Sequence, residues 1–599
     1  MQAIILAAGK GTRMGEFTQA IPKPMIELNG TTLIKRALDT LAATDINKIT
    51  IVVGHQGKKI MEHIGNSYKN TLLTYINNTD YDTKNNIHSI WLCRHDLIKD
   101  DTIIIDGDVI FDKESIQEIK NGSKNVIMIS PYAVWMNGTV IEYNKDNLPN
   151  ITKACIPSFD SERFKTVNIY KFSKEFSQNV YLPLIQKELE KNNFHLYYED
   201  VISSDILKQY FNMYKLKENE KWYEVDNPVD LASATLLFPP ENETYLTLVN
   251  SFGGHWRVPQ IKDFYYLNNP FFPTREILDD MKNAFEQLLI NYPSGRTIVD
   301  HLASVIFKIK KDYILVANGA SEIIDCLLRN IEGKYGTFLP TFDEYINRLS
   351  PEKTITYELN NKDFKLSIEE VKKLSDNVQN IVIINPNNPT GQIIHKKELL
   401  SILKFLKEKK KNLIVDESFA DFCHEDISLI NSSILAEYDN LYIIKSMGKS
   451  YGIPGIRLGV LITSNAETLS RVKKKLPIWN INSIGEYFLE VFPRHEKHFI
   501  NACINVQAER EYLFRELSEI KSLKVFHSHG NFILSRLMNN YSLQELVLWL
   551  YKKYGIFLKD CSGKRGFNEE PFLRIGIRNR KDNELLVKAL HEFFELNKK

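Results

Sequence analysis

Short runs of apolar residues alternate with amphipathic stretches along most of the chain. Ile4–Leu6, Ile49–Val53 and Thr102–Ile105 have the length and apolar character of buried strands. Between the first two runs, apolar residues fall on one face of a predicted helix: Leu33, Ile34, Ala37, Leu38 and Leu41. Strand–helix alternation of this kind predicts an α/β fold with mostly parallel sheets.

The same alternation returns in the second half of the chain. Ile381–Ile384, Leu413–Val415 and Leu441–Ile444 are again predicted strands. A last helix is predicted from the spacing of six apolar residues: Leu585, Leu586, Ala589, Leu590, Phe593 and Phe594. The second half is therefore predicted to be an α/β unit as well.

A chain of 599 residues is expected to contain more than one domain, because a single core rarely grows beyond about 250–300 residues. Two prolines, Pro239 and Pro240, end a predicted helix that begins after Pro228. We place a first domain at 1–238, a connector at 239–262 and a second domain at 263–599. Within the connector, Phe252–Trp256 suggests a turn followed by docking of the chain.

The composition is that of an ordinary globular protein, with 43% hydrophobic and 25% charged residues. Because 76 basic residues face 75 acidic ones, bulk charge gives no support for nucleic-acid binding. The six cysteines form no C-x-x-C pair, so neither a zinc site nor a disulfide framework is predicted. No apolar run approaches the roughly 20 residues that span a membrane, and the apolar N-terminus is too short for a signal peptide. A cytoplasmic protein without membrane insertion is expected.

The first candidate site begins with a glycine-containing loop after the first predicted strand. Gly9 and Gly11 let the backbone approach a ligand, and Lys10 and Arg13 add positive charge that suits a triphosphate. The loop is neither G-x-x-x-x-G-K-[ST] nor G-x-G-x-x-G, so neither of those phosphate-binding motifs is claimed.

Two further segments add to this site. Lys23 stands between two prolines in a segment that we expect to be stiff and extended, which limits the entropy lost when it meets a phosphate. Asp106-Gly107-Asp108 follows a predicted strand, and ligands bind at the carboxyl ends of strands in open α/β sheets. Carboxylates beside a phosphate loop are candidate ligands for Mg²⁺.

These motifs together resemble those of the sugar-nucleotidyltransferase superfamily, which are L-A-A-G-x-G-x-R-M, P-K-P and a G-D after a strand. The branch with the most similar motifs is the cytidylyltransferases that act on phosphocholine and related amines. Tyr81 and Asn85–Ser89 resemble its Y-x-x-x-N-N-I-x-S segment, and residues 197–200 and 222–226 resemble its later acidic motifs. The resemblance covers about 230 residues and implies a Rossmann-like nucleotidyltransferase domain.

The resemblance also implies roles for individual residues. It implies that Asp108 and Asp226 hold Mg²⁺ and that Lys23 is catalytic, steadying the α-phosphate of CTP. It implies a nucleotide site formed by Ala7, Ala8, Gly9, Gly11, Arg13, Lys23, Asn85, Asn86 and Ser89. We expect the ammonium of a small phospho- or phosphono-amine to lie near aromatic rings and carboxylates, because both favour a cation: Trp135, Tyr197, Tyr198, Glu199 and Asp200.

The second candidate site is built from four separated segments. Asn318–Glu322 precedes a predicted helix whose N-terminus suits a phosphate. Asn385–Gly391, Asp416-Glu417 and Ser446–Arg457 each follow a predicted strand. In this order the segments resemble those of a fold-type I pyridoxal-phosphate (PLP) enzyme of the class I/II aminotransferases, over about 330 residues. A large α/β domain and a small α+β domain are implied.

This second resemblance implies that Lys449 binds PLP covalently and later moves the proton, and that Asp416 pairs with the pyridine nitrogen. It implies that Phe342 stacks on the ring and that Arg574 binds the anionic group of the substrate. The cofactor-binding set that it implies is Gly319, Ala320, Ser321, Phe342, Asn388, Asp416, Ser446, Lys449 and Arg457. Phe419 departs from the family, where many members have a tyrosine. Spacing does not tell transamination from decarboxylation.

Joined in one chain, the two sites suggest one pathway, and the chain is similar to phosphonate-tailoring cytidylyltransferase–transaminase fusions. We expect the PLP domain to form 2-aminoethylphosphonate from phosphonoacetaldehyde and an amino donor, and the first domain to join it to CMP. One alternative is decarboxylation of phosphoserine followed by cytidylyl transfer to phosphoethanolamine. Another is a sugar-phosphate nucleotidyltransferase fused to an aminotransferase. The resemblance further implies a homodimer through the PLP domain.

Overall fold

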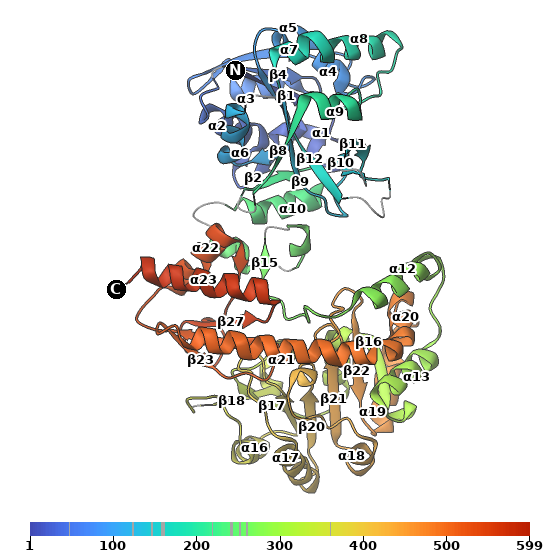
Figure 1. The fold of residues 1–599 in the computed structure, drawn as a ribbon. Coiled ribbons are helices and arrows are strands. Elements are labelled where there is room, and N and C mark those ends of the chain that lie inside the picture. The colour runs from blue at the N-terminus through green and yellow to red at the C-terminus, as the bar shows by residue number, and fades with distance from the viewer. Residues whose placement is uncertain are drawn as a thin grey trace. The chain divides into compact units, whose positions relative to one another are not determined.

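The computed structural model describes residues 1–46, 48–122, 125–144, 148–156, 162–217, 220–239, 244–250, 253–258, 261–359 and 361–598. The chain divides into two compact units, Met1–Ile261 and Lys262–Lys599, coloured blue to green and green to red in Figure 1. Within the expected boundary and connector, residues 240–242 and Phe252 lie outside the described residues. No helix in the described part of the chain is long and apolar enough to cross a membrane.

The N-terminal unit is built on a mixed sheet with the order β11-β10-β12-β7-β1-β4-β6-β5. The strands in this order are β1 (Gln2–Ala7), β4 (Lys48–Val53), β5 (Ser67–Tyr68), β6 (Thr71–Asn77), β7 (Thr102–Asp106), β10 (Thr139–Tyr143), β11 (Pro149–Lys153) and β12 (Glu162–Phe172). Two more strands belong to the same sheet: β9 (Asn125–Pro131) pairs with β12, and β13 (Phe211–Lys215) pairs with β9. β1 pairs in parallel with β4 and β7, and α2 (Leu33–Ala42) buries its apolar face against them. The predicted strands and helix of this half are confirmed.

A second pair of strands brings distant acidic residues together. β8 (Val109–Phe111) pairs antiparallel with β14 (Trp222–Glu224), with Val109 opposite Glu224. The helix that follows, α10 (Pro228–Leu237), ends before Pro239, as the two prolines predicted. Because Asp108 directly precedes β8 and Asp226 follows β14, the pairing places both carboxylates at one end of the small sheet.

The C-terminal unit contains a sheet with the order β16-β22-β21-β20-β19-β17-β18. Its strands are β16 (Ile314–Asn318), β17 (Tyr335–Leu339), β18 (Thr354–Glu358), β19 (Asn380–Ile384), β20 (Asn412–Asp416), β21 (Leu441–Ser446) and β22 (Leu458–Ile462). Only β22 runs antiparallel to its neighbours among these strands. The helices α16 (Ile368–Ser375), α17 (Lys396–Glu408) and α18 (Ser432–Glu437) lie together along this sheet (Figure 1). The three predicted strands of this half are confirmed.

A smaller sheet completes the C-terminal unit, with the order β23-β24-β27-β26. Its strands are β23 (Leu523–Phe526), β24 (Phe532–Leu537), β26 (Lys559–Asp560) and β27 (Phe572–Gly576). The helices beside it are α21 (Glu496–Ser518), α22 (Leu543–Tyr554) and α23 (Arg580–Leu596), the last of which confirms the predicted final helix. Arg574 lies on β27, so the smaller sheet brings it to the site formed by the larger one.

Two candidate active sites

The glycine loop lies where β1 ends and the chain turns. Gly11 has a φ of 63°, in the left-handed region that favours glycine, and an added Cβ would lie 2.8 Å from the Cβ of Lys23. Gly9 has open space around it, so packing does not explain that glycine. Ala7 and Ala8 are buried at the end of the strand. The loop therefore lies directly against Lys23 and the carboxylates that surround it.

Lys23 lies in a short 3₁₀ turn, Lys23–Met25, so the expectation of an extended segment is wrong at this residue. The turn forms because the amide of Met25 donates to the carbonyl of Pro22. Its ammonium contacts Asp108 and donates to Asp226 over 2.8 Å, and Arg13 donates to the same Asp226 oxygen over 2.7 Å. Burial alone would lower the pKa of Lys23, but the two carboxylates outweigh it and raise the pKa.

Three carboxylates form an acidic cluster: Asp108, Glu224 and Asp226 each bring an oxygen within 4.8 Å of the others. One oxygen of Asp108 is buried without a hydrogen-bond partner among the described residues. The cluster therefore fits a divalent cation, which would neutralise part of a triphosphate. Glu224 was not assigned as a ligand from the sequence, although its position two residues before Asp226, in the same acidic motif, was a usable signal.

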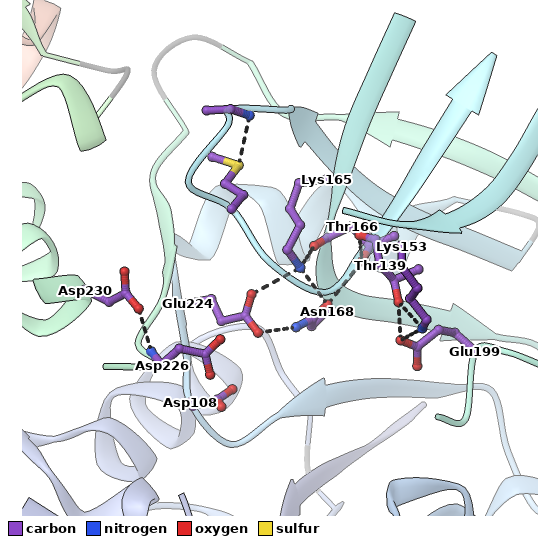
Figure 2. A network of polar contacts seen from close by, with 12 residues as sticks. Asp108, Thr139, Lys153, Lys165, Thr166, Asn168, Glu199, Glu224, Asp226 and Asp230 are labelled. Carbon is purple, nitrogen blue, oxygen red and sulfur yellow. Dashed lines mark hydrogen bonds and ion pairs between the residues drawn. The ribbon is translucent and has the colours of Figure 1, made fainter. Parts of the chain in front are cut away.

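Glu224 is held from its other side by two residues of β12. Lys165 approaches one of its oxygens at 3.1 Å, and the amide of Asn168 donates to the other over 2.9 Å (Figure 2). Asn168 has a φ of 57° where the pairing of β12 with β9 (Asn125–Pro131) is interrupted. This bulge turns the Asn168 amide toward the cluster. Burial raises the pKa of Glu224 to about 7, although the charge of Lys165 opposes the shift.

A cavity opens beside the acidic cluster. It is lined by Trp135, Met136, Asn137, Lys165, Trp222, Tyr223, Glu224, Asp226 and Asp230. Of the residues expected around an ammonium, Trp135 lies in this wall. Tyr198 is buried in a core cluster, and Glu199 is buried and accepts from Thr139 over 2.6 Å. Tyr197 and Asp200 contact Lys153 instead, so the structure does not bring the five residues together around one space.

The Asn85–Ser89 segment forms the start of α4 (Asn86–Leu92). Asn85 caps the helix by accepting from the amide of Asn86 over 2.8 Å. The side chain of Asn86 accepts from the amide of Tyr198, and Ser89 is buried and accepts from Asn78 over 3.0 Å. In the structure, each of these three side chains is therefore hydrogen-bonded to another residue of the chain.

In the C-terminal unit, the predicted cofactor residues gather at the carboxyl ends of β16, β19, β20 and β21. Helix α14 (Gly319–Asn330) begins there, with Ala320 and Ser321 in its first turn. Gly319 has a φ of 80°, and an added Cβ would lie 2.8 Å from a nitrogen of Arg457. A helix N-terminus beside a guanidinium is a cradle for a phosphate. Ser446 ends β21 and accepts from the amide of Gly448 over 3.3 Å.

Asp416 is buried at the end of β20 and accepts two hydrogen bonds. The hydroxyl of Tyr345 donates to it over 2.9 Å, and the amide of Ser418 donates over 3.0 Å. Burial raises the pKa of Asp416, and these donors oppose the shift. Tyr345 was not selected from the sequence, although it follows Phe342 by three residues. Phe419, the departure from the family pattern, packs its ring against Phe532 at 5.3 Å.

Lys449 lies close to two guanidinium groups. Burial, followed by the charges of Arg574 and Arg457, lowers the pKa of Lys449 to about 8, and Asp416 opposes the shift. A lysine with such a pKa is uncharged far more often near neutral pH than an ordinary lysine, and the neutral amine is the nucleophile. The carbonyl of Lys449 accepts from the amide of Asn269 over 3.0 Å, which fixes its backbone.

Arg574 reaches the same space from the smaller sheet. It donates to the side chain of Asn388 over 2.8 Å and to the carbonyl of Tyr265 over 2.7 Å, while its Nε is buried without a partner among the described residues. Phe342 is about one-third exposed, with its ring 6.5 Å from that of Tyr345. An orphaned guanidinium nitrogen, a phosphate cradle and a lysine of lowered pKa fit PLP, which supplies an electron sink when bound.

Comparison with known proteins agrees with both arrangements. Residues 279–590 match the model of the family described as aminotransferase class I and II, and residues 3–135 match the MobA-like NTP transferase domain. The chain belongs to the class I and II aminotransferases, fused to an NTP transferase domain. It is 30% identical to CMP-5'-(3-aminopropyl)phosphonate synthase of Streptomyces rubellomurinus, over 99% of this chain and 95% of the relative. The expected family and fold class are therefore confirmed.

The aminotransferase part has relatives of two kinds. It is 33% identical to L-serine phosphate decarboxylase of Campylobacter jejuni, over 57% of this chain and 91% of the relative. Among solved structures, histidinol-phosphate aminotransferase of Clostridium acetobutylicum superposes with a TM-score of 0.51 at 28% identity, over 56% of this chain and 99% of the other. A decarboxylase of Sulfurospirillum multivorans has the same score and identity, over 57% and 97%. The family admits both reactions.

Proposed function

We propose that this chain is a bifunctional enzyme that makes a CMP-linked phosphono- or phospho-amine. The NTP transferase unit transfers CMP from CTP to the amine, and the aminotransferase-fold unit, with PLP, forms the amine. The observation that carries the first assignment is the cluster of Asp108, Glu224 and Asp226 under Lys23 and the glycine loop. The pairing is supported by the relative that matches 99% of this chain, which is named as a CMP-5'-(3-aminopropyl)phosphonate synthase.

In the first reaction, an oxygen of the phosphonate or phosphate attacks the α-phosphorus of CTP. The bond from that phosphorus to the bridging oxygen breaks, and pyrophosphate leaves. Such transfer depends on alignment and charge neutralisation. Lys23 and Arg13 supply positive charge beside the loop, and the acidic cluster holds Mg²⁺. The cavity next to the cluster accepts the amine, whose ammonium lies among Trp135, Tyr223 and Asp230.

For the second reaction we favour decarboxylation of a phospho- or phosphono-amino acid. The bond from the α-carbon to the carboxylate breaks, carbon dioxide leaves, and a proton is added to the α-carbon. Relatives named serine phosphate decarboxylases, at 33% and 30% identity over more than half of the chain, support this choice. Lys449 is placed to move the proton, and Arg574 to bind an anionic group of the substrate.

Transamination is the second candidate for the aminotransferase-fold unit. Histidinol-phosphate aminotransferases of Methanococcus aeolicus and Clostridium novyi are 28% and 30% identical to it. In this case the substrate is phosphonoacetaldehyde with an amino donor, as the sequence led us to expect. The two reactions differ in their requirements, because only transamination consumes an amino donor and only decarboxylation releases carbon dioxide.

A pyrophosphate-release assay with CTP and Mg²⁺ tests the first reaction. We expect turnover of 2-aminoethylphosphonate, phosphoethanolamine or phosphocholine in preference to glucose 1-phosphate. The variant Lys23→Ala should abolish this release and leave carbon dioxide release from phosphoserine intact, and Lys449→Ala should do the reverse. Turnover of glucose 1-phosphate alone would contradict the amine assignment, and equal loss of both activities in either variant would contradict two independent sites.

We also propose a homodimer through the aminotransferase-fold unit. Large apolar side chains of α12 (Arg275–Ile290), α13 (Arg296–Phe307) and the 478–479 turn are exposed: Phe285, Leu289, Ile290, Ile298, Val305, Ile478 and Trp479. Monomeric proteins rarely expose large contiguous apolar patches. Light scattering should give twice the 69.5 kDa chain mass, and Leu289→Glu should shift it toward one chain. A monomeric wild-type protein would refute the dimer.

A further inference from the structure

The connector before the second unit contributes to the cavity of the NTP transferase unit. Gly253 and Gly254 have φ values of 83° and 77°, which form the turn expected there. They lead into the 3₁₀ turn His255–Arg257, in which His255 is buried. Val258 is fully buried in a cluster with Tyr223, a residue of the cavity wall.

Trp256 contacts an aromatic residue of the cavity wall, Trp135. Its ring lies 5.0 Å from the ring of Trp135, at an angle of 88°, although 59% of Trp256 is exposed. The guanidinium of Arg257 lies 4.6 Å from the centre of the Trp256 ring, and the Arg257 carbonyl accepts from the hydroxyl of Tyr223 over 3.4 Å. The turn is therefore tied to two residues that line the cavity.

Besides the ring pair, the side chain of Trp135 forms a hydrogen bond with the side chain of Tyr223, which also lines the cavity. Trp135 stands in an exposed turn between β9 and β10, and its neighbour Val134 is 85% exposed. A perpendicular ring pair is a favourable arrangement, because the positive edge of one ring meets the negative face of the other. Trp256 thus adds a second contact that restricts the orientation of the Trp135 ring.

We infer that Trp256 is a positioning residue for acceptor binding: it holds Trp135 against the amine, so the connector completes the acceptor side of the NTP transferase site. This inference rests on the proposed function for the identity of the acceptor. Among the described residues, the ring contacts of Trp256 are with Trp135 and Arg257, and not with the glycine loop or Lys23 that form the nucleotide side. Loss of Trp256 is therefore expected to weaken the acceptor and to leave CTP binding unchanged.

The test compares full-length Trp256→Ala with wild type in the pyrophosphate-release assay. We expect the KM for 2-aminoethylphosphonate to rise three- to tenfold, which is about 0.6–1.4 kcal/mol at 1.4 kcal/mol per tenfold change. The kcat and the KM for CTP should stay within twofold. Trp256→Phe should restore most of the affinity, because it keeps an aromatic ring. Leu246→Ala, at a 58% exposed position of the same connector, is the matched control and should change nothing.

A double-mutant cycle separates a positioning role from a general loss of structure. In a Trp135→Ala background, Trp256→Ala should have no further effect on the acceptor KM, because its target ring is gone. Additive effects would overturn the inference, as would an unchanged KM in Trp256→Ala or a parallel rise in both KM values. If wild type uses only glucose 1-phosphate, the proposed function fails, and the same comparison with that acceptor then decides the role of Trp256.

Discussion

Lys23→Met is the substitution whose consequences follow most directly from the structure. Methionine keeps the length of the side chain but removes the ammonium that lies between Asp108 and Asp226. The side chains of Lys23 and Asp226 are only 10% and 8% exposed, so Asp108 and Asp226 lose the Lys23 ammonium in a poorly hydrated place. Three carboxylate groups within 4.8 Å then repel one another, with Arg13 beside Asp226 and Lys165 beside Glu224 as the remaining cations.

The size of the effect can be estimated from this geometry. At 2.8 Å and an effective dielectric constant of about 20, one ion pair contributes about 6 kcal/mol before desolvation. Removing one partner of a buried pair costs about 3–5 kcal/mol after desolvation is included. For a unit of the size of Met1–Ile261, this corresponds to a lowering of the unfolding temperature by about 6–20 °C.

Differential scanning calorimetry with and without Mg²⁺ is the assay. We expect the lower unfolding temperature of Lys23→Met to recover with Mg²⁺, because the ion replaces the missing positive charge. Lys217→Met is the matched control: its partner Glu118 also lies at 2.8 Å, but both side chains are more than half exposed. Its loss should cost at most about 1 kcal/mol. Equal unfolding temperatures for wild type and Lys23→Met would refute the reasoning, as would failure of Mg²⁺ to stabilise the variant.

Three further outcomes are expected. Capture of PLP by the cofactor-free protein should accelerate with pH up to about 8 and then level off, because Lys449 loses its proton there; an inflection near pH 10 in stopped-flow absorbance would contradict this. Gly319→Ala should weaken retention of PLP on dialysis at least tenfold, because its φ of 80° strains any other residue, while Gly455→Ala, with open space, should not. Asn168→Ala should raise the Mg²⁺ concentration for half-maximal pyrophosphate release about tenfold, because the substitution removes the hydrogen bond that orients one oxygen of Glu224. An unchanged Mg²⁺ dependence would show that Asn168 does not orient Glu224.

The regular elements were predictable because their signals are local. The apolar run at Ile49–Val53 and the helical face from Leu33 to Leu41 each report burial through their own spacing, and the structure places them as predicted. Cofactor segments after Ile384 and Asp416 also follow from local pattern, since a polar residue after a buried strand falls at the edge of the sheet.

Contacts that depend on long-range pairing were not predictable from one sequence. Glu224 joins Asp108 only because β8 pairs with β14, more than a hundred residues later in the chain. Tyr198 is the opposite case, because a local motif suggested a contact with the substrate for a residue that is buried in an aromatic cluster. Its motif resembled a binding segment, yet the ring packs 5.3 Å from that of Tyr170 in the core. The sequence does not distinguish a tyrosine that binds a ligand from one that packs in a core, because the difference lies in the neighbouring residues in space.

The position of Lys23 couples metal binding to nucleotide binding in the proposed reaction. Its ammonium pairs with Asp108 and Asp226, and it can move to a phosphate only if another cation takes over those carboxylates. Mg²⁺ arriving with CTP meets that requirement, whereas CTP alone would leave the acidic cluster facing a triphosphate. We therefore expect the affinity for CTP to rise with Mg²⁺ and, by linkage, the affinity for Mg²⁺ to rise with CTP. In Lys23→Met the Lys23 ammonium no longer competes for Asp108 and Asp226, so Mg²⁺ should bind more tightly without nucleotide and gain less from it. Calorimetric titrations that found the same dependence on CTP in both proteins would show that Lys23 does not exchange partners.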